Sequence, residues 1–235
     1  QNGPGAVQSG DEVSLETDGK FLAVLDDNVA VVEKESSLTK FILDIKDQSA
    51  PMRIGFTTTL VDGFQDVEWF GRGPHESYLD RHASARVAFY QQSILEQTVK
   101  YVRPQENGNK FQTRWMALKR KQSDPCNMLL IAAQDPSPQL DMQCHHYALS
   151  DFDGGEEKVK QTFLHAGELV ARQTTALCID AIQMGVGGID SWGNKPLEEH
   201  MIGAQQEANW TFQLIPSTYG GGDWRLHLLG YPTTT

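Results

Sequence analysis

The sequence has little of what ties a chain to a membrane or to nucleic acid. Its 235 residues contain no run of about 18 apolar residues, the length that a helix needs to cross a bilayer. Positive charge is also scarce, because 20 Lys and Arg stand against 31 Asp and Glu and give a formal net charge of -11. Such a balance repels phosphate backbones and anionic lipid surfaces. We expect no nucleic acid and no membrane as partners, and the compartment stays open between the cytoplasm and the bacterial periplasm.

Cysteine is too sparse for a disulfide framework. The three cysteines, Cys126, Cys144 and Cys178, are odd in number, lie far apart and match no CxxC spacing. Free cysteine is among the most buried residue types. We therefore expect reduced thiols that pack inside the fold.

Clustered metal ligands are scarce as well. Adjacent residues of a strand point to opposite faces, so His145 and His146, even with Cys144 beside them, make a poor site for one ion. His75 and His82 have no companion at HxH or HExxH spacing. We expect no metal site in this chain.

Short apolar or alternating segments bounded by turn residues are present from end to end. They predict an all-β, antiparallel fold, since Gly, Asn and Asp between them favour tight turns. The twelve candidate strands are Glu12–Thr17, Phe21–Leu25, Val29–Glu33, Thr39–Ile45, Met52–Leu60, Gln65–Phe70, Thr113–Lys119, Met128–Ala133, Leu140–Tyr147, Ala176–Met184, Asn209–Ile215 and Trp224–Leu229.

Two segments depart from this pattern. Glu156–Leu164 has acids in its first turn and Val159 and Phe163 four residues apart, which predicts a short helix. Arg81–Gln97 is ambiguous, because its Ala, Gln and Glu content favours a helix while Val87–Tyr90 favours a strand.

A first polar cluster lies in Trp69–Arg81, where Gly71, Gly73 and a following proline predict an irregular crossing. Glu76 and Asp80 could form an acid/base pair, with Arg81 lowering one pKa. Carboxylates and an arginine beside such a turn more often form ion pairs and caps. We prefer the structural interpretation.

A second cluster is Tyr101–Lys110, with Arg114 and Trp115 just beyond it. Its Glu106-Asn107-Gly108 sequence is typical of a hairpin turn with two positive φ angles. We expect Glu76 or Glu106 to form a buried pair with an arginine, and a catalytic role for Glu106 is the less favoured alternative.

A third cluster is Gln183–Gly193. Its glycines lack the spacing of a phosphate-binding loop. They place Trp192 in a loop with the short polar residues Asp190, Ser191 and Asn194. An indole in such a loop can anchor the core or stack on the apolar face of a sugar, and these residues alone favour the core anchor.

Taken together, the three clusters resemble the C-terminal domain of glycoside hydrolase family 2 β-galactosidases, which is also found as a separate small chain. The matching residues are Trp69–Arg81, Tyr101–Gly108 with Arg114 and Trp115, and Met184–Gly193. The resemblance implies an antiparallel supersandwich similar to that of galactose mutarotases. It covers residues 40–235, and residues 1–39 form a strand-rich lead that we expect to belong to the same domain.

The resemblance also implies a division of labour. Catalytic carboxylates in that family lie on a separate TIM barrel, so this chain is expected to have no catalytic residue and to partner a TIM-barrel catalytic domain or large subunit. The family's Asp-Ser-Trp tryptophan corresponds to Trp192, which is therefore expected to bind a galactoside substrate, with weaker contributions from Asp190, Ser191 and Asn194. No cofactor is implied for this chain, although Mg and Na are candidates in the parent enzyme.

Two alternatives stay open. A free-standing, mutarotase-like sugar epimerase would need two of His75, His82, His145 and His165 to converge with a carboxylate. A carbohydrate-binding module would bind sugar without any chemistry.

Overall fold

The computed structural model describes much of the chain. Its backbone is described for residues 12–16, 20–24, 29–35 and 38–44, and backbone and side chains for residues 52–60, 63–120, 127–152, 163, 165–187, 195–203 and 208–216, with the backbone of Ser217. Among these residues, no helix has both the length and the apolar character needed to span a bilayer.

The described residues form thirteen strands, and every pairing between them is antiparallel. The strands are β1 (Glu12–Glu16), β2 (Lys20–Val24), β3 (Val29–Glu35), β4 (Leu38–Asp44), β5 (Arg53–Leu60), β6 (Asp66–Gly73), β7 (Arg86–Ser93), β8 (Lys110–Thr113), β9 (Trp115–Lys119), β10 (Met128–Gln134), β11 (Leu140–His145), β12 (Thr175–Gln183) and β13 (Ala208–Ser217). The helical elements of the described residues are the single turns η1 (Ile94–Gln97), α1 (Leu149–Phe152), η3 (Ala166–Glu168) and η4 (Glu198–His200).

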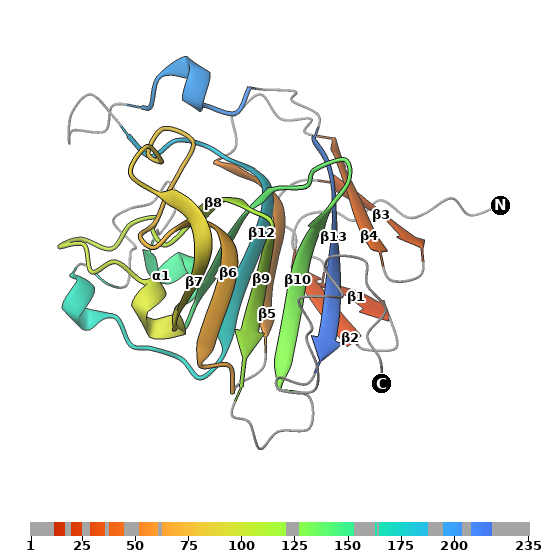
Figure 1. Cartoon of the computed structure of the whole chain (residues 1–235), viewed down its shortest axis with the longest axis horizontal. Coiled ribbons are helices and arrows are strands. Elements are labelled where there is room, and N and C mark those ends of the chain that lie inside the picture. The colour runs from red at the N-terminus through yellow and green to blue at the C-terminus, as the bar shows by residue number, and fades with distance from the viewer. Residues whose placement is uncertain are drawn as a thin grey trace.

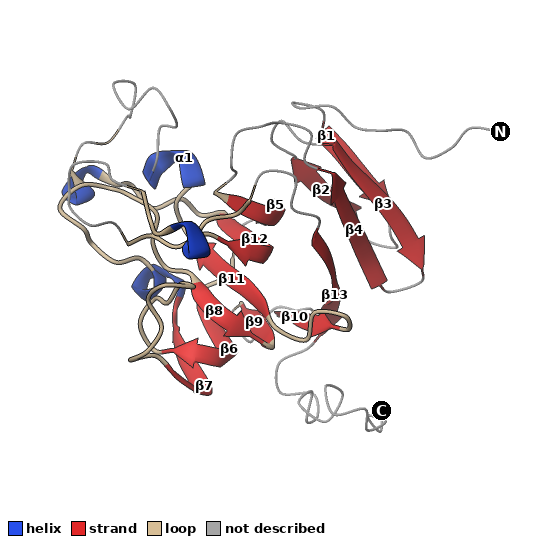
Figure 2. Cartoon of the chain, turned by 90° about the horizontal axis from the view of Figure 1, so that it is seen from above, coloured by secondary structure: helices blue, strands red, loops and turns tan. Residues whose placement is uncertain are grey.

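Two sheets make up the body of the molecule. The larger has the order β3-β4-β13-β10-β9-β6-β7 and the smaller the order β5-β12-β11-β8, while β1 and β2 form a separate hairpin. Figure 1 shows the larger sheet face-on, and Figure 2 shows the smaller sheet lying behind it as a second layer. The all-β prediction is confirmed, whereas the likeness to galactose mutarotases stays a prediction.

The main core fills the space between the two layers. Leu140, Met142, Leu177 and Ile179 of the smaller sheet belong to the same buried cluster as residues of β6, β9, β10 and β13. The rings of Phe56 in β5 and Phe212 in β13 are 5.7 Å apart and join the layers directly. Burial of this apolar surface is the main favourable term in folding.

Alternate residues of the larger sheet's central strands pack on its other face. In β10, Leu129 and Ile131 belong to the main core, while Met128, Leu130 and Ala132 join a second cluster with Trp115. This period-two alternation explains why β10 is a continuous apolar run with both faces buried.

Eleven of the twelve predicted strands are confirmed, with ends that differ by a few residues. The twelfth, Trp224–Leu229, lies outside the described residues, as does nearly all of the predicted helix Glu156–Leu164. The ambiguous segment Arg81–Gln97 contains strand β7 followed by η1. The domain boundary at residue 40 stays a prediction, and the backbone of β3, from the lead, pairs with β4 in the larger sheet.

One turn prediction is wrong. Gly108 has a φ of +83°, but the non-glycine residue with positive φ in the described part of the chain is Gln112, so Asn107 does not have the positive φ that the expected turn requires. No strand lies between η1 and β8 to form the first arm of a hairpin. Asn107 instead donates to the carbonyl oxygens of Val99 and Gln105, which holds a wider loop together.

Candidate functional site

The described parts of the three polar clusters lie next to one another. The main-chain N–H of Ser77 donates to the carbonyl oxygen of Asn109, which ties the first cluster to the second. The carboxylate of Asp80 accepts from the main chain at Val186 and Gly187, which ties the first cluster to the third. Segments that are far apart in the sequence thus form one polar region.

Glu76 is a buried hub of this region, with 3% of its surface exposed. One carboxylate oxygen accepts from the guanidinium of Arg81 and from the hydroxyl of Tyr101, and the other accepts from the main-chain N–H of Gly108 at 2.8 Å. The expected pairing of Glu76 with an arginine is therefore confirmed. These three donors satisfy a carboxylate that would otherwise be costly to bury.

Glu106 is held by an arginine that the sequence analysis did not single out. Arg53 Nη2 donates to Glu106 Oε2 at 2.7 Å, and Arg53 Nη1 lies 3.3 Å from Asp180 Oδ2. The hydroxyl of Tyr78 also donates to Glu106, at 3.5 Å. Burial raises the pKa of Glu106, while the charge and hydrogen bond of Arg53 act in the opposite direction.

Arg114, the arginine just beyond the second cluster, has a different role. Its Nη1 donates to the carbonyl oxygen of Gln112, and its guanidinium lies 5.4 Å from the centroid of the Phe70 ring. A strand position fixes which face a side chain takes but not which strand lies opposite. Arg53, in β5, therefore could not be chosen as the partner from spacing alone.

Asp80 binds the main chain of Val186 and Gly187, a few residues before Trp192 in the sequence. Its Oδ1 accepts from Val186 N at 3.1 Å and its Oδ2 from Gly187 N at 2.7 Å. A Cβ atom added at Gly185 or Gly187 would lie 2.5 or 2.9 Å from Asp80 Oδ2, so the carboxylate approaches this closely only because both residues are glycine. The main-chain N–H of Gly185 also donates to the carbonyl oxygen of His200 at 2.7 Å.

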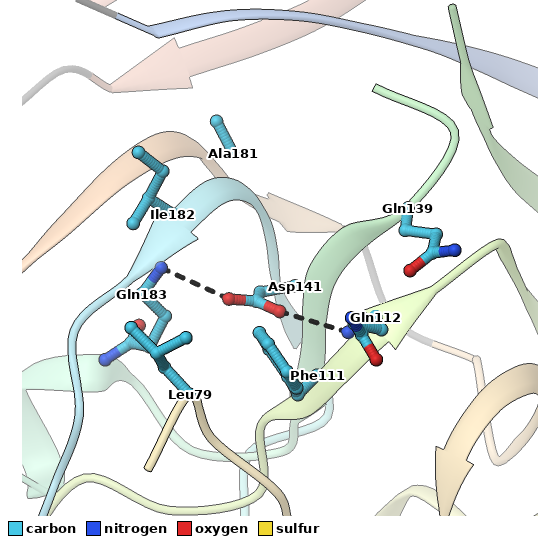
Figure 3. Close-up of a pocket in the computed structure, with 8 residues that line it drawn as sticks. All are labelled: Leu79, Phe111, Gln112, Gln139, Asp141, Ala181, Ile182 and Gln183. Atoms are coloured by element: carbon cyan, nitrogen blue, oxygen red, sulfur yellow. Dashed lines mark hydrogen bonds between the residues drawn. The ribbon is translucent and has the colours of Figure 1, made fainter. Parts of the chain in front are cut away.

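A pocket of about 290 Å³ opens beside this region at the ends of β8, β11 and β12 (Figure 3). The buried carboxyl group of Asp141 lies in its floor and accepts from the main-chain N–H groups of Gln112 and Gln183, both at 3.2 Å. Burial raises the pKa of Asp141 to about 8, and the neighbouring charge of Asp180 acts in the same direction. Asp141 and Asp180 face each other in the pairing of β11 with β12.

Comparison with known proteins places this architecture in a family. The sequence pattern of the β-galactosidase small chain matches residues 15–214, which is most of the chain. The chain belongs to this family. The match includes all three polar clusters and both layers of the small-chain domain.

Individual β-galactosidases agree with this assignment. The small-chain domain is 32% identical over 163 residues to the β-galactosidase of Priestia megaterium, and 36% identical over 155 residues to that of Vibrio cholerae. It is 31% identical over 170 residues to the β-galactosidase of Psychromonas ingrahamii. These alignments cover 69%, 64% and 72% of the chain but only 14%, 13% and 14% of the relatives. The chain therefore spans a small part of the length of the curated relatives that it matches.

The residues predicted to contact substrate are not placed by the structure. Trp192, Asp190, Ser191 and Asn194 lie outside the described residues, and the described backbone stops at Gly187 and resumes at Lys195. Their roles stay predictions. The small-chain domain does show what precedes them, because β12 ends at Gln183 and Asp80 binds the residues that follow.

Two buried acids of this region, Asp141 and Asp180, and the partly exposed Arg53 were not among the predicted site residues. Each lies within or near the start of a predicted strand. An acid between two large apolar residues, such as Asp141 between Leu140 and Met142, is a usable signal for a buried polar group. Its partner cannot be read from the same pattern.

The two described cysteines and the buried His145 have packing roles. Cys144 and Cys178 are free thiols inside the fold, as predicted, while Cys126 lies outside the described residues. The ring nitrogens of His145 are in contact with Thr98 Oγ1 and Asn107 O, and burial lowers the pKa of His145 to about 3. Within the described residues, no group of three or more His, Cys, Asp or Glu side chains has the arrangement of a metal site.

Proposed function

We propose that this chain is the non-catalytic, C-terminal or small-chain domain of a retaining glycoside hydrolase family 2 β-galactosidase. In this proposal it completes the substrate pocket beside a TIM-barrel catalytic domain or large subunit, and Trp192 forms part of the wall that contacts terminal β-D-galactosides. The observation that carries the proposal is the match to the small-chain family, together with the small share of each relative that the chain spans.

The state of the candidate carboxylates supports a non-catalytic role. A retaining glycosidase uses two carboxyl groups about 5–5.5 Å apart on either side of the scissile bond. Glu76 is occupied by Arg81, Tyr101 and a main-chain N–H, and Glu106 is occupied by Arg53 and Tyr78. Both glutamates therefore act as structural anchors of the polar region.

The anchoring of the third cluster supports a role for the segment that contains Trp192. Asp80 accepts two main-chain hydrogen bonds at Val186 and Gly187, only a few residues before Trp192. An aromatic ring contributes most to binding when its backbone is held in place before the ligand arrives. Sugar rings offer apolar C–H faces to such an indole.

The test uses the enzyme assembled from this chain and its catalytic region, with Trp192→Ala and the conservative control Trp192→Phe. We expect Trp192→Ala to raise KM for lactose roughly tenfold, equivalent to about 1.4 kcal/mol. Trp192→Phe should retain most of the affinity, because a smaller aromatic ring still stacks. Circular dichroism should show both variants folded.

Two outcomes would contradict the proposal. If Trp192→Ala has the same kinetics as the wild type, Trp192 makes no contact with the substrate. Hydrolysis of lactose by the purified 235-residue chain, abolished by Glu76→Gln or Glu106→Gln, would show that the chain carries its own catalytic carboxylates.

A further inference from the structure

The pocket around Asp141 has no role in the proposed function, and its chemistry is unusual. Eight residues line it: Leu79, Phe111, Gln112, Gln139, Asp141, Ala181, Ile182 and Gln183. Half of them are apolar and half carry an amide or a carboxyl group. Among the described residues, no lysine, arginine or histidine lines it. Figure 3 shows these side chains gathered around the carboxyl group of Asp141.

Gln183, one of the residues that line this pocket, carries a buried polar group without a partner among the described residues. The residue is 1% exposed, and both its Oε1 and its Nε2 lack a hydrogen-bond partner among the described residues. Buried amides are nearly always hydrogen-bonded. A ligand that satisfies this group must both donate and accept a hydrogen bond, which is what a hydroxyl group does.

Gln112 adds a strained backbone to the same wall. Its φ of 57° lies in the left-handed region, which residues other than glycine seldom adopt. This conformation aims its main-chain N–H at Asp141, and its side-chain oxygen accepts from Arg72 Nε at 2.7 Å. Strain of this kind is concentrated at sites that bind ligands.

The lining decides among the chemical classes of ligand. Phosphate, sulfate or carboxylate ligands would meet Asp141 with no cationic side chain in the wall to offset it. A cation would need an ionised Asp141, but burial raises the pKa of this group to about 8 and so disfavours the ionised form. A protonated carboxyl group donates a hydrogen bond. A wholly apolar ligand would leave Gln183 unsatisfied.

We propose that this pocket binds one sugar residue of a neutral carbohydrate, with ligand hydroxyl groups hydrogen-bonded to Asp141 and Gln183 and an apolar sugar face against Phe111. A sugar suits the mixed lining, because it carries hydroxyl groups around its edge and C–H groups on its faces. The proposal concerns residues other than Trp192 and does not depend on the substrate contact proposed above.

The first experiment maps binding on the 235-residue chain by titrating D-galactose at pH 7 and following main-chain amide resonances by NMR. The expected result is a saturable shift of the Gln112, Asp141 and Gln183 resonances, retained in Trp192→Ala. Retention in that variant separates this pocket from any binding at Trp192. Absence of a saturable shift at these three residues would overturn the proposal, as would a shift there with sodium chloride and none with galactose.

The second experiment compares Gln183→Leu with Gln143→Leu. Gln143 is a matched control, because it is also 1% exposed, its amide also lacks a partner among the described residues, and it does not line the pocket. Gln183→Leu should weaken galactose binding at least tenfold, while Gln143→Leu should leave it unchanged. Equal affinity in the wild type and Gln183→Leu would overturn the proposal. If Gln183→Leu does not fold, the NMR titration of the wild-type chain with D-galactose tests the proposal by itself.

Discussion

At the scale of single residues, Asp80 is the contact that joins the start of the polar region to its end. It bridges to Val186 and Gly187 across more than 100 positions of sequence. Hydrogen bonds to a charged group contribute about 1.5–3 kcal/mol each, which is more than neutral ones contribute. A single side chain can therefore determine how the segment before Trp192 leaves the sheet.

We predict that Asp80→Ala raises KM of the assembled enzyme for lactose several-fold and leaves kcat less affected. The physical reason is that the main-chain N–H groups of Val186 and Gly187 lose their acceptor, so the following segment is less well positioned. Steady-state kinetics measure the effect, and a thermal melt shows whether the domain is still folded.

Asp80→Asn is the matched control for this prediction. Its amide keeps one oxygen acceptor, so we expect an intermediate KM. Equal KM values for the wild type, Asp80→Asn and Asp80→Ala would show that the bonds to the glycine segment do not position any substrate contact.

Glu76 and Glu106 show which partners of a buried acid can be predicted from the sequence. The interpretation of Glu76 as an ion-pair and capping residue is confirmed by its contact with Arg81. This pair could be predicted because the two residues are only five positions apart in the sequence. Glu106 was also expected to pair with an arginine, but its partner Arg53 lies 53 positions away in another strand. Local partners can be read from spacing, and distant ones cannot.

At the scale of elements, the junction between β8 and β9 shapes the pocket. Gln112 takes a left-handed φ near the end of β8, and the pairing of β8 with β11 shifts its register between Leu140 and Met142. Such irregularities bend a strand and redirect its groups. Here the main-chain N–H of Gln112 turns toward Asp141 rather than into the ladder.

We predict that Gln112→Gly is more stable than Gln112→Ala by about 1–2 kcal/mol. Both substitutions remove the bond from Arg72, but only glycine adopts the left-handed conformation without strain. Urea unfolding of the two variants measures the difference. If alanine proved as stable as glycine, the left-handed conformation at this junction would be refuted.

The predicted and observed ends of a strand agree closely where the pattern of apolar residues was clear. The predicted strand Met128–Ala133 became β10, Met128–Gln134, because six consecutive apolar residues have no other compact arrangement in an all-β chain. The predicted strand Thr113–Lys119 instead begins at Trp115, after β8 has ended at Thr113. A local break of this kind depends on contacts across the sheet, so it cannot be predicted from the residue types of the strand.

At the scale of the whole molecule, the buried acids make the free energy of unfolding depend on pH. Burial raises the pKa of Asp141 to about 8, and it raises the pKa of Asp180 to about 6 although Arg53 acts against it. An unfolded aspartate has a pKa of about 3.9. Since both folded values are higher, the folded state holds these protons more tightly, and the stabilising effect is complete below about pH 4.

We predict that these two acids make the domain less stable as pH rises from about 4 to about 8, with Asp180 contributing mainly below pH 6. One group changes the free energy of unfolding by up to about 1.4 kcal/mol per pH unit. Urea unfolding of the wild type and Asp141→Asn between pH 5 and pH 8.5 isolates the effect of Asp141. The wild type should lose stability relative to Asp141→Asn across this range.

The comparison uses the difference between the two proteins because titrating groups that do not interact with Asp141 act equally in both. A constant difference from pH 5 to pH 8.5 would show that Asp141 titrates at its ordinary pKa and is not desolvated in the folded domain.

The sequence by itself determined the fold class, the places of most strands, the buried thiols and the family. All of these depend on local chemistry, namely apolar period, turn residues and short motifs. Only the tertiary structure decided that Arg53 pairs with Glu106 and Asp180, and that Asp141 lies opposite Asp180 under a pocket. The physical reason is that a period of two fixes the face of a side chain, whereas the order and register of strands in the two sheets fix what that side chain meets.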